Sequence, residues 1–180
     1  TQAEERQTRQ VVRGVVNVFA QNQEEFSDSF VDWSAWDGTY TFIEDADPQY
    51  IQSNLIPEAL VNLKLNLVLF VHHSGRIVFG TRFDLKTQQQ TPIPQELIEQ
   101  FANSDRLWQH NDLTSRTTGI LLLPSGPMVI TSQPIVTTKG IGPIRGTVIF
   151  GRYLDADAIK KLAQINRVSL KIYPVNEAEL

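Results

Sequence analysis

Two apolar runs with a short turn between them most constrain how this chain can fold. The runs LNLVLFVHH and RIVFGTRFD, residues 65–73 and 76–84, flank the dipeptide SG. β-Branched and aromatic residues fill both runs, and a short turn containing Gly indicates a β-hairpin. From about residue 118 the chain continues as a strand, a turn, a strand, a glycine-rich turn and a strand at about 144–154. Because hairpin-linked strands pair with their neighbours in sequence, the pattern predicts an antiparallel sheet.

Helices are predicted before, between and after these strands. From Gln2 to about Trp36 there is no Pro and only one Gly, and apolar residues recur at helical spacing. We therefore predict one long helix over residues 1–36. Its apolar stripe consists of Val12, Val16, Phe19, Phe26, Phe30 and Trp33. Further helices are expected at PQYIQSNL, PEALVNL, PQELIEQFANSDRLWQ and DADAIKKLAQIN, a loop at KTQQQTPIPQ and a last strand at VSLKIYPV.

Helices kept apart from hairpin-linked strands indicate the α+β class rather than a doubly wound parallel fold. With 180 residues, 41% of them hydrophobic, the chain is long enough to bury a sizeable core. We expect a single domain over residues 1–180, with the long helix at 1–36 and an α+β core at 37–180. A long N-terminal helix packed on an antiparallel sheet, with helices covering one face, resembles the PAS-like architecture of extracytoplasmic Cache sensor domains.

Composition excludes several classes of protein. The net charge of -4, with Lys and Arg scattered along the chain, gives no basic surface for nucleic acid. The absence of Cys excludes disulfides and thiolate metal sites. No run of about 18 apolar residues is present, so no membrane span is expected. Met128 is the only methionine, so we expect the chain to be processed or to be part of a longer protein.

No catalytic or metal-binding constellation is found in the sequence. Asp32 and Asp37 are five positions apart on a predicted helix, which does not suit a pair of glycosidase carboxylates. The stretch GIGPIRG lacks the Lys-Ser/Thr of a phosphate-binding loop. His72 and His73 are adjacent on a predicted strand, so we expect them to face opposite sides and not to share a metal. The sequence therefore predicts a binding module rather than an enzyme, with no cofactor and no structural metal.

The densest aromatic segment is VDWSAWDGTYTF, residues 31–42. Trp33 continues the apolar stripe of the predicted helix, so we expect it to anchor the core. Trp36 and Tyr40 fall off that stripe near the expected helix end, and they can serve either as core residues or as walls of a ligand cavity. We expect the segment to close one side of the core and to contribute to a pocket.

Three further residues complete the candidate ligand site. Asp37 precedes a glycine at the expected helix end, where the helix dipole disfavours a carboxylate; its partner is either a protein donor or a cationic ligand. Trp108 lies between a helix and a strand, as a lid over the core or as a ligand contact. Arg145 follows GIGP and either binds a carboxylate, forms an ion pair or faces solvent. The candidate ligand-binding residues are Trp36, Asp37, Tyr40, Trp108 and Arg145, a set compatible with an amine or an acid.

Several ordered motifs resemble those of the fourth class of CHASE domains, the sensory extracellular modules associated with cyclases and histidine kinases. DWSAWDGTYTFIED is similar to an Asp-Trp-x-x-Trp-Asp-x-Tyr-x-Phe run of that family. YIQSNL, LNLVLFVHHSGRIVFG, PMVITSQPI and GPIRGTVIFGRYLD follow in a similar order and spacing, so the likeness covers about Asp32 to Leu162. Gly38 departs from the pattern, which more often has an acidic or polar residue there, and this puts any side-chain role at that position in doubt.

The resemblance implies a periplasmic, ligand-sensing domain of a bacterial inner-membrane receptor, between two transmembrane helices. Its output would belong to an attached histidine kinase, diguanylate cyclase or phosphodiesterase. The alternative is an extracytoplasmic domain that binds a small molecule or sugar without signalling. Because the predicted helix is too long for one small sheet to cover, we also expect a homodimer through the stripe residues Val12, Val16 and Phe19.

Overall fold

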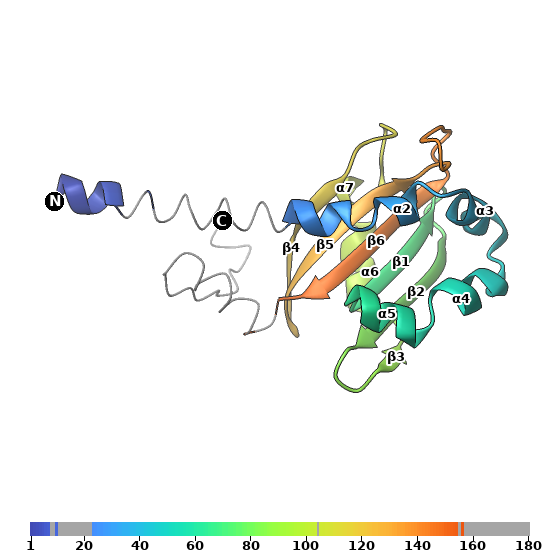
Figure 1. The fold of residues 1–180 in the computed structure, drawn as a ribbon, viewed down its shortest axis with the longest axis horizontal. Helices are drawn as coiled ribbons and strands as arrows, with labels where there is room; N and C mark the ends of the chain where they lie inside the picture. The colour runs from blue at the N-terminus through green and yellow to red at the C-terminus, as the bar shows by residue number, and fades with distance from the viewer. Residues whose placement is uncertain (8–9, 11–22, 104, 155, 157–180) are drawn as a thin grey trace.

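The computed structural model describes residues 1–7, 10, 23–103, 105–154 and 156 of the chain. In this part, six strands form one antiparallel sheet in the order β3-β2-β1-β6-β5-β4 (Figure 1). The strands are β1 (Leu67–His72), β2 (Ile77–Asp84), β3 (Gln89–Thr91), β4 (Thr117–Leu123), β5 (Gly126–Ile135) and β6 (Gly146–Tyr153). At the centre, β1 pairs with β6, so that Leu67 lies opposite Gly151 and His72 opposite Gly146. The predicted α+β class and antiparallel sheet are confirmed.

Local sequence signals locate most of the strands correctly. The expected hairpin is β1 and β2, and the expected meander is β4, β5 and β6. The stretch expected to be a loop contains β3, which pairs with the end of β2 through Arg82 and Thr91. All three residues of β3 are exposed and polar, so no apolar alternation marks this edge strand in the sequence. Apart from Ala156, which is helical, the helix and strand predicted after residue 154 lie outside the described residues.

The N-terminal helix does not continue unbroken to Trp36. Residues 2–7 and 23–28 are helical, a turn follows at residues 29–30, and α2 (Val31–Ser34) and α3 (Asp37–Asp45) are separate helices. Between them Ala35 forms a parallel bridge with Val136, because Val136 N–H donates to Ser34 O at 3.0 Å. This contact with a distant strand end bends the chain, and helical periodicity alone does not reveal it. The stripe residues Val12, Val16 and Phe19 lie outside the described part.

Four more helices surround the sheet. They are α4 (Pro48–Asn54), α5 (Pro57–Leu63), α6 (Gln95–Ala102) and α7 (Asp105–Trp108). Both α4 and α5 begin with Pro, whose missing N–H is not needed at a helix start, and Asp47 caps α4 by accepting from Gln49 N–H at 2.9 Å. The single helix expected over residues 94–109 is two helices. None of the described helices is long and apolar enough to cross a membrane.

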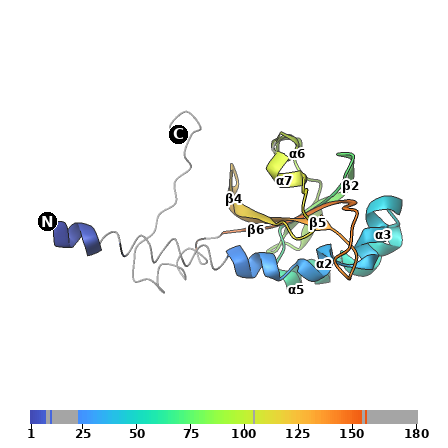
Figure 2. The same cartoon turned by 90° about the horizontal axis from the view of Figure 1, so that it is seen from above.

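Alternate strand residues form two apolar cores, one on each face of the sheet. Residues 23–28 and helices α2 to α5 cover one face, and α6 and α7 cover the other (Figure 2). The first core contains Phe30, Phe42, Phe70, Phe83 and Phe150. The second contains Leu69, Leu97, Phe101, Met128 and Ile149. Helices therefore cover both faces, not the single face expected from the sequence, and each face offers a separate place for a ligand.

Candidate functional site

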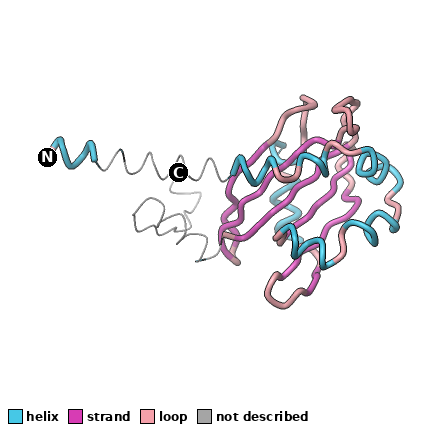
Figure 3. Tube along the Cα trace, viewed as in Figure 1, coloured by secondary structure: helices cyan, strands magenta, loops and turns pink. Residues whose placement is uncertain are grey.

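A pocket of about 220 Å³ lies on the α7 face of the sheet, at the end where β6 begins. Its lining residues are His73, Trp108, Gln109, His110, Asn111, Ile144, Gly146 and Thr147. Figure 3 shows the α7–β4 and β5–β6 connections as loops at this end of the sheet. These side chains offer imidazole, amide, hydroxyl and indole groups within one small volume. The pocket therefore suits a small polar ligand better than an apolar one.

Strand β6 fixes the position of Trp108. The Thr147 hydroxyl donates to Trp108 O at 2.7 Å, and Thr147 itself is buried in β6. Gly146 allows this strand to begin close to β1, because a Cβ atom there would lie 2.3 Å from Val71 O. The α7 end of the pocket is thus attached to the centre of the sheet, although 39 residues separate Trp108 from Thr147.

The indole Nε1 of Trp108 is buried and has no hydrogen-bond partner. It is the one buried side-chain nitrogen or oxygen without a partner among the described residues. An indole N–H only donates, and a buried donor without an acceptor costs about 1–3 kcal/mol. Because the nitrogen is shielded from solvent, a bound molecule with an acceptor atom would remove this cost only after the indole or the loop beside it moves to expose the N–H.

His110 holds the loop after α7 against the sheet. Its Nδ1 lies 2.7 Å from Ser115 Oγ and its Nε2 2.9 Å from Ser132 Oγ, on β5. The Ser132 hydroxyl donates to Leu107 O, so it accepts its hydrogen bond from His110 Nε2–H. Burial lowers the pKa of His110. This burial favours the neutral imidazole, in which Nε2–H donates to Ser132 Oγ and Nδ1 accepts from the Ser115 hydroxyl, so the ring holds the pocket wall in place.

Of the five residues predicted for the ligand site, Trp108 alone lines this pocket. Trp36 lies on the other face of the sheet, where its ring contacts Trp33 edge-on and Tyr50 at a tilt. Asp37 is the first residue of α3 and not the last residue of a helix, as the sequence suggested. Its carboxylate accepts from Thr138 N–H at 2.9 Å and lies at a helix N-terminus, where the dipole favours a negative charge.

Tyr40 and Arg145 contact each other on the same side as Trp36. The guanidinium carbon of Arg145 lies 3.8 Å from the centre of the Tyr40 ring, and its Nη1 donates to Tyr40 O at 3.0 Å. The Tyr40 hydroxyl donates to Pro143 O at 2.8 Å. The aromatic segment thus closes one side of the core, as expected. The structure brings Trp36, Asp37 and Tyr40 to the start of α3, Arg145 to the β5–β6 loop beside it, and Trp108 to the opposite face.

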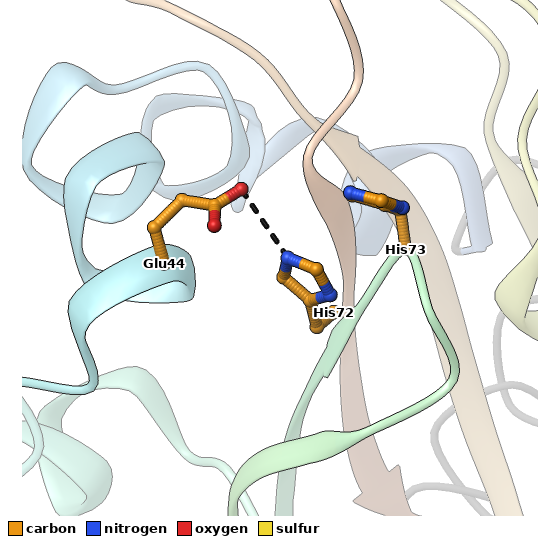
Figure 4. A group of neighbouring side chains, drawn as sticks. All are labelled: Glu44, His72 and His73. Atoms are coloured by element: carbon orange, nitrogen blue, oxygen red, sulfur yellow. Dashed lines mark hydrogen bonds and ion pairs between the residues drawn. The ribbon is translucent and has the colours of Figure 1, made fainter.

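His72 and His73 also differ from expectation. Their ring centroids are 4.1 Å apart, although adjacent residues of a regular strand point to opposite faces (Figure 4). Strand β1 ends at His72, and the chain turns as His73 N–H donates to Arg145 O at 2.9 Å. The expectation that the two rings face opposite sides is therefore wrong, and strand alternation does not exclude a metal shared by His72 and His73.

An antiparallel sheet with helices packed on both faces is the fold of PAS/Cache-like domains. One solved structure with this fold is a domain from Vibrio parahaemolyticus, assigned to the sensory box/GGDEF family, with a TM-score of 0.56. It is 12% identical, and the match covers 87% of this chain and 62% of that one. The extracellular domain of vpHK1S-Z8, a protein assigned as a histidine kinase, has a TM-score of 0.55 and 12% identity, with 91% and 60% coverage.

Sequence comparison defines the family. The CHASE4 domain family matches residues 18–173, so the chain belongs to the CHASE4 family of sensor domains, as the motif resemblance predicted. The chain is also 30% identical over 179 residues to the methanogenesis regulatory histidine kinase FilI of Methanothrix harundinacea (strain 6Ac). That match covers 98% of this chain and 20% of the kinase. The chain thus spans about 20% of the length of this curated relative.

Proposed function

We propose that this chain is the extracytoplasmic ligand-sensing domain of a transmembrane receptor whose output is a histidine kinase, a diguanylate cyclase or a phosphodiesterase. Membership of the CHASE4 family and the likeness to a histidine kinase support this sensory role. In this proposal the domain catalyses no reaction. It binds a small molecule and passes a change of conformation through a flanking membrane helix.

The unpaired N–H of Trp108 carries the proposal for where the ligand binds. Such a donor selects a molecule with a hydrogen-bond acceptor, and the pocket volume of about 220 Å³ limits that molecule to a small polar metabolite. Asn111 and Gln109 add amide groups that can donate and accept. Trp36, Asp37, Tyr40 and Arg145, by contrast, act in packing and in contacts between α3 and the β5–β6 loop.

Two neighbouring residues of β5 offer a route from this pocket to the N-terminal helix. Ser132 contacts His110 on the α7 face, as described above. Gln133, the next residue, is buried on the opposite face, where its Nε2 donates to Ser27 O at 2.7 Å. Ser34 Oγ donates to Gln133 Oε1 at 2.7 Å. A ligand that displaces the His110 loop would thus shift β5 and, with it, the end of the first helix.

We also propose that two copies pair along the first helix in the receptor. This proposal rests on the spacing of Val12, Val16 and Phe19 in the sequence, and membrane helices would hold the copies at high effective concentration. The chain contains no Cys, so single cysteines can be introduced cleanly. Efficient crosslinking at Val12 or Val16, but not at Arg13, supports a defined interface. Equal crosslinking at all three positions contradicts it.

A thermal-shift screen against small metabolites tests the ligand site. A ligand at 100 times its dissociation constant stabilises the domain by about 2.7 kcal/mol. Trp108→Phe keeps an aromatic ring and removes the N–H, and Trp36→Phe is the matched control on the other face. Metabolites that raise the melting temperature of the wild-type domain are expected to have no such effect on Trp108→Phe and to keep it on Trp36→Phe. The reverse pattern would move the ligand site to the aromatic segment, and a screen without hits would count against small-molecule sensing.

A further inference from the structure

Glu44, His72 and His73 bring three potential metal ligands together where α3 passes the end of β1 (Figure 4). One ligand atom from each residue lies within 4.8 Å of the other two. Glu44 belongs to the last turn of α3, His72 ends β1, and His73 follows in the turn. Two imidazoles and one carboxylate, with an open fourth position, are a ligand set that Zn²⁺ binds in proteins.

The spacing of His72 and Glu44 already fits two ligands of one zinc ion. His72 Nε2 lies 3.2 Å from Glu44 Oε1. Two ligands at about 2.1 Å from a tetrahedral zinc are roughly 3.4 Å apart. His73 is exposed, and its imidazole makes no hydrogen bond to the described residues. Rotation of its side chain can therefore bring a ring nitrogen to within bonding distance of a zinc ion held by His72 and Glu44.

We propose that Glu44, His72 and His73 bind one Zn²⁺ ion, with water as the fourth ligand. This site does not depend on the proposed function, because it uses the geometry of α3 and β1 alone. His73 also lines the pocket beside Trp108. A metal here would therefore join α3, on one face of the sheet, to a wall of the ligand pocket on the other.

Ser74 contacts Nδ1 of His72, the ring nitrogen that does not face the proposed metal. His72 Nδ1 lies 2.8 Å from Ser74 Oγ and 3.2 Å from Ser74 N, which donates to it. When Nε2 binds the metal, Nδ1 carries the ring proton and donates it to Ser74 Oγ, and the longer bond from the backbone N–H is lost. Residues that orient a histidine ligand in this way typically contribute 10–100-fold to metal affinity.

Arg145 forms only a long ion pair with Glu44, with which a metal would compete. Its Nε lies 3.9 Å from Glu44 Oε1, which is too long for a hydrogen bond, and its Nη1 donates to Tyr40 O instead. The Glu44 side chain is 43% exposed and the His72 side chain 12%. Zn²⁺ can thus reach the carboxylate from solvent, while the His72 ring is held in place.

Calorimetric titration of the 180-residue chain with ZnCl₂, in excess MgCl₂, tests the site, because Mg²⁺ prefers oxygen ligands and does not compete for imidazole. One Zn²⁺ per chain is expected. His73→Ala and Glu44→Gln should each weaken binding by about 100-fold, and Ser74→Ala by about 10-fold. Glu58→Gln, an exposed acid on α5, should leave the affinity unchanged. Unchanged affinity in both His73→Ala and Glu44→Gln, or no binding at millimolar Zn²⁺, would overturn the proposal.

Imidazole nitrogen NMR gives a readout that does not depend on variants. The chain has three histidines. Zn²⁺ is expected to shift the resonances of His72 and His73 and to leave those of His110 in place. A shift confined to His110, or equal broadening of all three, would overturn the assignment of the site.

Discussion

The indole of Trp36 lies so close to Gly38 that a Cβ atom on the glycine would be 2.7 Å from the ring. Real Cβ contacts are never that short, so any side chain at this position requires Trp36 to move. Glycine at position 38, where the family motif more often has an acidic or polar residue, leaves room for the Trp36 indole. That indole contacts both Trp33 and Tyr50.

Gly38→Ala is therefore expected to destabilise the domain by about 1–3 kcal/mol, through overpacking against the indole. The higher helix propensity of Ala offsets part of this cost. Gly119→Ala is the matched control, because nothing lies within 4 Å of a Cβ atom there. Urea unfolding measures both. Equal stability of the two variants would show that Trp36 is not held against Gly38.

Gln133 is fully buried, and both ends of its amide are hydrogen-bonded to Ser27 or Ser34. Gln133→Met keeps much of the volume but removes two buried hydrogen bonds, each worth about 0.5–1.5 kcal/mol, so we expect a loss of about 1–3 kcal/mol in the free energy of unfolding. Gln52→Met, at an exposed position of α4, is the control and should change stability by less than about 0.5 kcal/mol. If Gln133→Met lowers the free energy of unfolding by less than about 0.5 kcal/mol, the hydrogen bonds of the Gln133 amide contribute little to stability.

The stability of the domain should depend on pH through His110. Burial lowers the pKa of the folded imidazole, whereas the unfolded imidazole titrates near 6.5. Below about pH 6.5 the unfolded state therefore binds more protons than the folded state, and the free energy of unfolding falls as pH falls. Above that pH both states are neutral and the effect is absent.

Urea unfolding from pH 8 to pH 5 checks this prediction, with His110→Gln for comparison. The wild type is expected to lose stability below about pH 6.5 more steeply than the variant. Subtracting the two curves removes the contributions of His72 and His73. Parallel curves would contradict a neutral, buried His110.

Sequence reasoning succeeded where the signal was local. The SG turn and its flanking apolar runs define β1 and β2, and the prolines at 48 and 57 mark the starts of α4 and α5. It failed where a distant contact decides the structure. The helical segment at residues 23–28 ends at a turn, and the bridge between Ala35 and Val136 then separates α2 from α3, so that Asp37 begins a helix where the sequence suggested that one was ending.

The candidate site was predictable only in part. Trp108 stands out in the sequence as an aromatic residue between a helix and a strand, and it does line the pocket. Thr147, which fixes its backbone, carries no local signal, because the contact depends on how α7 packs against β6. The closeness of His72 and His73 was missed because strand alternation was extended one residue past the end of β1.

Indole N–H NMR during ligand titration tests the central claim most directly. The chain has three tryptophans, Trp33, Trp36 and Trp108, so three indole N–H resonances are expected. When a metabolite that stabilises the domain is added, we predict that the Trp108 resonance moves downfield as its unpaired N–H gains an acceptor, while the other two stay in place. A bound metabolite that shifts Trp36 or Trp33 and leaves the Trp108 resonance unchanged would contradict the proposed ligand site.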